Sequence, residues 1–324
     1  MTMRPDFSLL CANMKTINQA GWLRGISVAV AVQFMGFLGG CATHTFTVET
    51  AQAAAGEGNP EAQYFLSRRY AKGEGVARDY VKAAEYLRLA ALQGYAKAQN
   101  NLGADYIQGL GVPQDYVEAD KWFQRAADQG DPLAEYSLGA SYCLGRGVAT
   151  NMVEAVKWFG LAARQDQLDA ELELGNIYLG GRGLPEDYRA ARKWFRRAAA
   201  QHSARAINAL GYIAEQGGFG VAKDLAEARK YYLRAAAAWD VKALMNLGRV
   251  YLEGIGVERD SIEAYKWFYL ASKIGGGAGR HYLSELDGTV NFGDLTGKPL
   301  TGEQIKEAVQ RAEAFQGLHS KPGN

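Results

Sequence analysis

The chain has 324 residues, of which 48% are hydrophobic, so it can bury a sizeable core. Its 36 Lys and Arg residues balance 35 Asp and Glu residues, and the net charge of +1 argues against nucleic acid as a partner, because nucleic-acid binding needs clustered positive charge. The three cysteines, Cys11, Cys41 and Cys143, share no metal-ligand spacing, and their odd number provides no disulfide framework.

The first predicted element is an apolar run at residues 26–38, which follows the basic residues Lys15 and Arg24. The run is shorter than the roughly 20 residues that cross a bilayer, and it is typical of the hydrophobic region of a secretory signal peptide. The sequence Leu-Gly-Gly-Cys at 38–41 comes next and resembles the lipobox of bacterial lipoproteins, in which cleavage precedes a cysteine that is then lipid-modified.

This resemblance implies a signal peptide at residues 1–40, a lipid on Cys41 and a tether at residues 41–50. Ala42 follows the cysteine, and in proteobacterial sorting a residue other than Asp there favours the outer membrane, facing the periplasm. Two alternatives stay open. The segment is an ordinary signal peptide with a chance cysteine, or Met14 is the true start, in which case Cys11 is not part of the protein.

From residue 62 onward the chain repeats the pattern Ala-x-x-x-Leu-Gly at a spacing of 36 residues, and once of 37. Such a period is the signature of a repeat architecture. The alanines that open the six units are Ala62, Ala98, Ala134, Ala170, Ala206 and Ala243, so the units cover residues 62–278. The extra residue lies in the glycine-rich run 217–220.

Each unit predicts a helix, a glycine turn and a second helix. In the third unit Ala134, Leu138 and Tyr142 form one helical stripe, Gly145 suits a helix C-cap, and Asn151 suits the N-cap of the next helix. The equivalent N-cap residues are Asp79, Asp115, Asn151, Asp187, Asp224 and Asp260. The second helices repeat a pair of large side chains: Tyr86-Leu87, Trp122-Phe123, Trp158-Phe159, Trp194-Phe195, Tyr231-Tyr232 and Trp267-Phe268. Only stacked neighbouring units can bury these rings.

These motifs resemble the Sel1-like repeat family, which is related to the tetratricopeptide repeats, over about two-thirds of the chain. The resemblance implies an all-α fold, a right-handed α/α superhelical solenoid that binds proteins or peptides. The departures are Ser67 after Leu66 in place of glycine, Ala214 in place of tyrosine, and Asp166, His202 or Trp239 at the turn that closes a unit. We expect these to weaken local turns and to leave the fold intact.

Caps are expected at both ends of the array, because terminal repeats otherwise expose the core. Residues 51–61 predict an N-terminal capping helix. Residues 279–316 predict a half-repeat, a polar glycine-rich insertion and a final helix that begins at Thr301, with Gln304 in capping-box spacing. Residues 317–324 are expected to be a disordered tail.

The variable positions of the first helices predict the binding face, because in the related tetratricopeptide fold these helices line the concave side. Asn and Arg there can hydrogen-bond an extended peptide or its carboxylate, and Tyr adds contact area. The candidate residues are Tyr64, Arg68, Asn100, Asn101, Tyr136, Asn176, Asn208, Tyr212, Asn246 and Arg249. A solvated face without a ligand, or binding on the convex side or at the ends, remains an alternative.

No catalytic motif, metal-ligand set or cofactor fingerprint stands out in the sequence. Cys143 and His202 fit packing and turn roles, whereas Trp239 fits either packing or a ligand contact. We therefore predict a protein that is not an enzyme, a scaffold of the bacterial cell envelope that binds a protein or peptide, as in an export complex. The alternatives are a module that binds polysaccharide, peptidoglycan or a host, and, in another class, a β-lactamase-like hydrolase.

Overall fold

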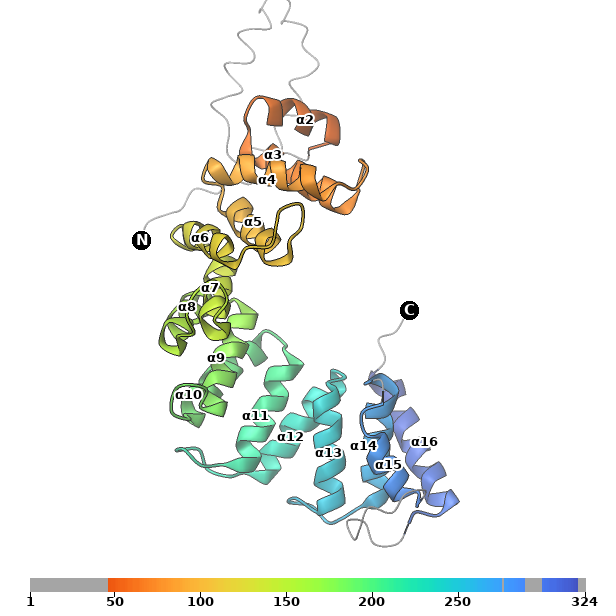
Figure 1. Ribbon diagram of the computed structural model, residues 1–324. Helices are drawn as coiled ribbons and strands as arrows, with labels where there is room; N and C mark the ends of the chain where they lie inside the picture. The colour runs from red at the N-terminus through yellow and green to blue at the C-terminus, as the bar shows by residue number, and fades with distance from the viewer. Residues whose placement is uncertain (1–45, 276, 289–298, 320–324) are drawn as a thin grey trace, which may run out of the picture. The chain divides into compact units, whose positions relative to one another are not determined.

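A computed structural model describes residues 46–275, 277–288 and 299–319 of the chain. The chain divides into two units, Met1–Thr47 and Val48–Asn324, and only residues 46 and 47 of the first unit are described. The predicted signal peptide and Cys41 lie outside the described residues, so both assignments stay predictions. Within the described residues the fold consists of fifteen helices, α2 to α16, and a single isolated β-bridge (Figure 1).

Six helix pairs make up most of the second unit, as the repeat predicts. The first helices are α3 (Pro60–Lys72), α5 (Ala96–Gln108), α7 (Pro132–Leu144), α9 (Leu168–Gly180), α11 (Ala204–Gln216) and α13 (Val241–Glu253). The second helices are α4 (Tyr80–Leu92), α6 (Tyr116–Ala127), α8 (Met152–Arg164), α10 (Tyr188–Ala200), α12 (Leu225–Ala237) and α14 (Ser261–Ile274). The prediction of an all-α solenoid of helix pairs is confirmed.

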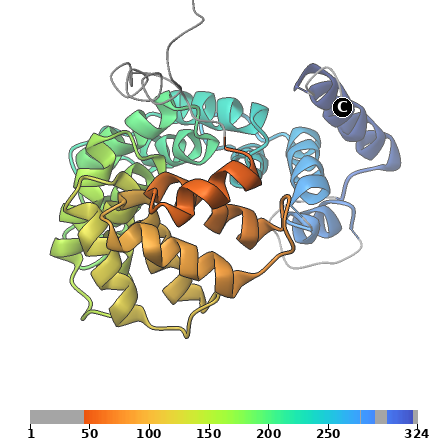
Figure 2. The same ribbon diagram turned by 90° about the horizontal axis from the view of Figure 1, so that it is seen from above.

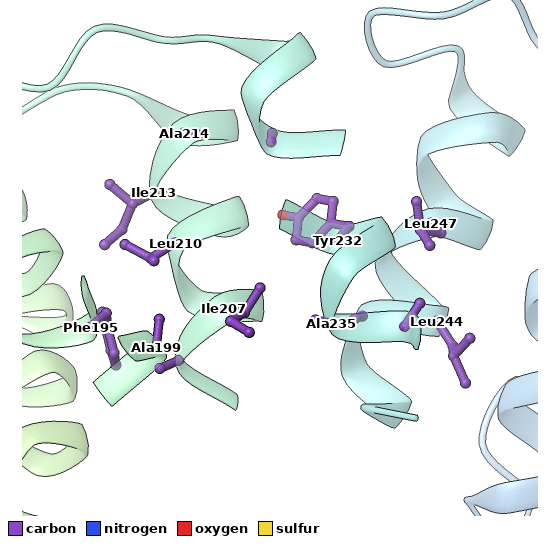
Figure 3. Packing of buried hydrophobic residues seen from close by; sticks show 14 of the residues in the cluster. Phe195, Ala199, Ile207, Leu210, Ile213, Ala214, Tyr232, Ala235, Leu244 and Leu247 are labelled. Atoms are coloured by element: carbon purple, nitrogen blue, oxygen red, sulfur yellow. The ribbon is translucent and has the colours of Figure 1, made fainter. Parts of the chain in front are cut away.

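Neighbouring helices share one uninterrupted series of contacts. Each first helix packs against the second helix of its own pair and against the second helix of the preceding pair. Figure 3 shows this arrangement around Tyr232 of α12, which lies between Leu210 of α11 and Leu247 of α13. The alanines and leucines of the repeated motif are buried in every pair. The segment from Val48 onward therefore has its own core and does not need the preceding residues to form it.

The predicted cap residues, six N-caps and six glycine C-caps, stand at the helix ends where the sequence predicts them. The side chain of each of the six N-cap residues accepts a hydrogen bond from a backbone N–H in the first turn of its second helix. Five of the six first helices end on a glycine in the left-handed region, and α11 ends on Gly217, whose φ of 63° is combined with an extended ψ. The turn chemistry of the sequence therefore fixes both ends of the connecting loop.

The glycine that follows the repeated leucine has a packing role and no turn role. It lies in the middle of the first helix, where a Cβ atom added to Gly139 would come within 2.6 Å of the Phe159 ring of its own pair. The same contact with a ring recurs at Gly103, Gly175, Gly211 and Gly248. In the first pair Ser67 stands at this position and Leu87 replaces the ring, so the two departures compensate one another. Our expectation that Ser67 weakens a turn is therefore wrong.

A row of hydrogen bonds between polar side chains crosses the first four pairs. Gln93, at the end of α4, donates to Gln63 of α3 at 2.8 Å, and both belong to the same unit. The equivalent bonds join Gln129 to Gln99, Gln165 to Glu135 and Gln201 to Glu171, at 2.7–2.9 Å. In the fifth unit Ile207 and Ala238 occupy the two positions. The polar row thus ends in the fourth unit, and Leu172 and Phe195 of that unit already belong to the hydrophobic cluster that continues through the following units.

The turns that close the third, fourth and fifth units keep the geometry of the glycine turns. Asp166, His202 and Trp239 have φ values of 59°, 64° and 61°, and Gly94 and Gly130 in the same place have 85° and 78°. A side chain other than glycine costs about 1–2 kcal/mol in this region, so the substitutions strain these turns without changing their path. The inserted residue of the fifth unit forms a tight turn that presents Phe219, which is 59% exposed and has a φ of 47°.

Both ends of the array carry additional helices. The N-terminal capping helix α2 (Val48–Gly56) begins inside the expected tether and ends before residue 61. Its residues Ala51 and Ala55 are buried, and the helix packs against α3. At the other end α15 (Arg280–Leu286) is the half-repeat, and α16 (Gly302–His319) packs against α14 (Figure 2). The capping box is present, since Thr301 N donates to Gln304 Oε1 at 2.9 Å and Gln304 N donates to Thr301 Oγ1 at 3.3 Å.

Two features of these ends bear on the predictions. Helix α16 continues to His319, so residues 317–319 are helical and not part of a disordered tail, while residues 320–324 lie outside the described part of the chain. The same holds for residues 289–298 of the predicted insertion. None of the helices in the described ranges combines the length and the apolar character that crossing a membrane requires.

Candidate binding groove

A groove of about 1130 Å³ lies between the first helices of the last three units, α9, α11 and α13. We call it the binding groove and define it by three kinds of lining residue. The amides are Asn176, Asn208 and Asn246, the aromatic residues are Tyr188, Phe195, Tyr212 and Trp239, and the cations are Arg182, Arg205 and Lys242. Leu172, Leu179 and Met245 supply apolar surface.

The three amides come from three successive units. Asn246 Nδ2 donates to Asn208 Oδ1 at 2.9 Å, so α13 and α11 are joined directly across the groove. That bond uses one donor of Asn246 and one acceptor lone pair of Asn208. The remaining donors and acceptors of both amides are available to a ligand, and so is the amide of Asn176.

The aromatic residues differ in how firmly they are held. Tyr188 is only 8% exposed and its ring centroid lies 5.0 Å from that of Phe219, so the tight turn of the fifth unit packs on it. Trp239 packs edge-on against Phe315 of α16 at 5.8 Å, which shows that it anchors the final helix while it also lines the groove. Tyr212 is 40% exposed and is the aromatic side chain most open to a ligand.

Positive charge exceeds negative charge along the groove. Two acidic residues, Glu186 and Asp240, accompany the three cations of the lining. Asp240 is already committed, because its carboxylate caps α13 by accepting from Ala243 N at 2.8 Å. The lining therefore carries a small excess of positive charge.

Four of the ten candidate residues of the sequence meet in the binding groove: Asn176, Asn208, Tyr212 and Asn246. The other six lie elsewhere. Asn101 Nδ2 donates to the Tyr64 hydroxyl at 3.2 Å, Asn100 is buried at 8% exposure, and Arg68 is exposed on α3. Tyr136 lies against Phe159 and lines a separate cavity of about 210 Å³ between α5 and α7.

Arg249 is held in a buried cluster that ties three helices together. Its guanidinium donates to both carboxylate oxygens of Glu215 at 2.7 and 2.6 Å, and Glu215 also accepts from the Tyr232 hydroxyl at 2.9 Å. The Glu215 side chain is only 5% exposed. Burial, followed by the negative charge of Glu215, raises the pKa of Tyr232 above its usual range. Arg249 therefore serves first to hold α13 against α11 and α12.

Sequence reasoning missed the cations of the groove. Arg205 and Lys242 each stand one residue before the alanine that opens a unit, and that column of the repeat was not counted as part of the binding face. Comparing it across units would have shown the two positive charges. Arg182 and Glu186 lie in the turn after α9, where helical periodicity does not predict which way a side chain points. The described residues contain no group of three or more His, Cys, Asp and Glu side chains that could hold a metal ion.

A series of helix pairs with a groove along their first helices defines an α-solenoid repeat protein. The chain belongs to the Sel1 repeat family, whose sequence model matches residues 60–95, 96–131, 132–167, 168–203, 204–238 and 241–276. Proteins of this family generally mediate protein–protein interactions and are generally non-catalytic.

Two solved structures are similar over most of the chain. The Sel1 repeat protein from Oxalobacter formigenes is 31% identical, with a TM-score of 0.63, and the match covers 81% of this chain and 98% of that one. The second is c5321, described as a protective antigen present in uropathogenic Escherichia coli strains and displaying an SLR fold. It is 27% identical, with a TM-score of 0.55, over 86% of this chain and 68% of that one. A search of curated proteins returns no significant match.

Proposed function

We propose that this protein is a non-catalytic scaffold that binds an extended polypeptide segment of a partner protein in the binding groove. The observation that carries the proposal is the set of three amides from successive units, Asn176, Asn208 and Asn246, at one surface. A side-chain amide both donates and accepts, so it can pair with the N–H and C=O groups of any extended backbone. The general role of Sel1 repeat proteins in protein–protein interaction supports this assignment.

The remaining groove residues suggest which segments would bind. Tyr212 offers an exposed ring that can cover an apolar side chain at small cost in conformational entropy. Arg205 and Lys242 would attract acidic side chains or the carboxylate at a chain terminus. We therefore propose that the preferred segment is extended, carries at least one negative charge and presents an apolar side chain to Tyr212.

Removing the groove contacts is expected to abolish capture of the partner. We expect the double change Asn208→Ala and Tyr212→Ala to weaken binding by about tenfold or more, since contact residues at the centre of an interface commonly contribute over 1 kcal/mol each. A photo-crosslinking amino acid at position 212, used in intact cells, should capture a polypeptide. When the crosslinker is placed at a neighbouring groove residue, the double change should lower the yield of the crosslinked polypeptide.

The matched control is the same crosslinker at Arg88, which is exposed on the second helix α4. Equal capture from positions 88 and 212 would show that the groove is not the binding surface. Capture of a glycan in place of a polypeptide would contradict the ligand class. Hydrolysis of a β-lactam by the purified protein would contradict the non-catalytic assignment.

We also propose that the protein is a lipoprotein anchored through Cys41 and sorted to the outer membrane, where it faces the periplasm and takes part in an envelope complex. The support is the sequence alone: an apolar run followed directly by Leu-Gly-Gly-Cys at 38–41. The change Cys41→Ser is expected to remove fatty-acid labelling and to release the protein from the membrane fraction. Cys143→Ser is the matched control, and unchanged labelling of the Cys41 variant would rule out the anchor.

A further inference from the structure

Positive charge gathers on the second helices of the fourth and fifth units, α10 and α12. Helix α10 carries five basic residues and no acidic residue: Arg189, Arg192, Lys193, Arg196 and Arg197. Helix α12 adds Arg229, Lys230 and Arg234 against the single acid Glu227. The chain as a whole has a net charge of only +1, so this is a local excess.

Two of these cations lack the acid that accompanies them in other units. The lysine before the aromatic pair forms an ion pair with a glutamate three residues earlier in three units: Lys121 with Glu118 at 2.9 Å, Lys157 with Glu154 at 3.2 Å and Lys266 with Glu263 at 2.6 Å. In the fourth unit that acid is replaced by Ala190. In the fifth unit it is present as Glu227, but Glu227 pairs with Arg192 at 3.3 Å. Lys193 and Lys230 therefore form no ion pair with any described residue.

Arg234 has lost its partners in a comparable way. In the preceding unit Arg197 pairs with Asp166 at 2.7 Å and with Glu171 at 2.8 Å. Arg234 is the equivalent of Arg197 one repeat later. The residues equivalent to the two acids are His202 and Ile207, neither of which carries a negative charge. Arg234 is exposed, and so is Arg196, and neither forms an ion pair within the described part of the chain.

These four cations lie on the second helices of successive units, and Lys193 and Lys230 occupy equivalent positions of the repeat, so they project in the same direction from the array. The bond between Arg192 and Glu227 shows that α10 and α12 are neighbours. Lys193 and Arg196 are three residues apart and Lys230 and Arg234 are four apart, so each pair lies on one side of its helix within about 6 Å along the axis. We call Lys193, Arg196, Lys230 and Arg234 the cationic surface. None of them lines the binding groove, so a ligand of the cationic surface does not compete with a peptide there.

We propose that the cationic surface binds the anionic headgroups of a lipid bilayer. Four exposed charges of one sign repel each other, and an oppositely charged layer relieves that repulsion. Their exposure on the second helices of two successive units presents them to a broad anionic surface, as basic residues at membranes are presented. The proposal uses the proposed lipid anchor only to bring the protein near a bilayer. The contact itself does not depend on Cys41.

Vesicle flotation of the segment 46–324 tests this contact without the signal peptide or Cys41, and the segment retains the whole helical core. We expect it to bind vesicles of phosphatidylglycerol and phosphatidylcholine and to bind phosphatidylcholine alone much more weakly. Binding should fall steeply when added salt shortens the Debye length from about 10 Å to about 3 Å. Equal binding to both kinds of vesicle would overturn the proposal.

A matched pair of double variants tests the residues. Changing Lys193 and Lys230 to Gln should weaken binding to the anionic vesicles by about 25-fold, since each basic residue near such a surface contributes about fivefold. Changing Lys121 and Lys157 to Gln removes the same charge from ion-paired lysines and should have a much smaller effect, although Lys157 lies over Trp158 as Lys193 lies over Trp194.

Equal losses in the two double variants would overturn the assignment to the cationic surface. Tighter binding to soluble polyglutamate than to the anionic vesicles would show instead that the partner is an acidic polypeptide. Because the segment lacks Cys41, failure in this experiment is distinct from failure of the lipid anchor, which the Cys41→Ser variant of the full chain reports.

Discussion

Replacing Gly139 by serine is expected to lower the free energy of unfolding by about 2–3 kcal/mol, because it overpacks a filled core. The new Cβ atom would lie 2.6 Å from the Phe159 ring, which is well inside van der Waals contact. Phe159 is 1% exposed and packs among Ala155, Ala162 and Leu174, so the ring has no room to move aside. Denaturant unfolding followed by circular dichroism measures the loss.

The first unit of the chain supplies the compensating change. There Ser67 is accommodated, at 4% exposure, opposite Leu87 in place of a ring. Adding Phe159→Leu to Gly139→Ser therefore recreates a pair that this protein already contains. Each single change is expected to destabilise, the first through a clash and the second through a cavity. The loss in free energy of unfolding of the double variant should be smaller than the sum of the two single losses by about 1 kcal/mol or more, since the effects of residues in contact are coupled.

Strict additivity of the two losses would show that the glycine and the ring do not restrict one another. The measurement has to allow for the architecture, because the stability of a solenoid is a sum over units and their interfaces and its unfolding need not be two-state. Hydrogen exchange of the α7 and α8 amides resolves this, since it reports the loss in the third unit separately from its neighbours.

Much of the fold could be predicted because the evidence for it is local and periodic. Asn151 caps α8 as expected, since an N-cap needs only a side-chain oxygen a few residues from the N–H that it accepts. Gly145 ends α7 for an equally local reason. Small Ala and Gly residues at recurring positions predict a close approach of the helices, but the partner of Gly139 could not be predicted, because Phe159 lies 20 residues away on the other helix of the pair and the period alone does not say which columns of the repeat touch.

The binding face was predicted only in part, for a related reason. The candidates are the third, fourth or seventh residues of their units, counted from the opening alanine, and these positions share one side of the first helix. The groove nevertheless includes only four of the ten candidates. A side chain on the expected side can form a hydrogen bond with a neighbouring residue of the protein, as Asn101 does with Tyr64 and Arg249 does with Glu215. Groove residues from turns, such as Arg182, follow no helical period. Which candidates are open to a ligand depends on contacts between units that differ from one unit to the next.

Glu215 is expected to have a large effect on stability although it is not part of the hydrophobic core. Changing it to alanine should lower the free energy of unfolding by about 3 kcal/mol, because it removes the buried carboxylate that accepts hydrogen bonds from both Tyr232 and Arg249. Its loss leaves the hydroxyl of the fully buried Tyr232 without its acceptor, and it leaves Arg249, whose side chain is 29% exposed, with Glu253 at 3.6 Å as its remaining ion-pair partner. Denaturant unfolding of Glu215→Ala measures the loss, with Glu253→Ala as an exposed control that also faces Arg249.

Replacing all three members of this cluster together should cost far less than removing Glu215 alone. The fourth unit has Leu179 and Phe195 where the fifth has Glu215 and Tyr232, so the fold accommodates an apolar pair at these positions. The free energy of unfolding of the triple variant Glu215→Leu, Tyr232→Phe, Arg249→Leu should lie within about 1–2 kcal/mol of the parent value, because exchanging a buried ion pair for apolar side chains is often neutral. If the triple variant is as unstable as Glu215→Ala, the cluster itself stabilises the joint between α11, α12 and α13. If it is not, the three polar residues matter to this joint only as a matched set.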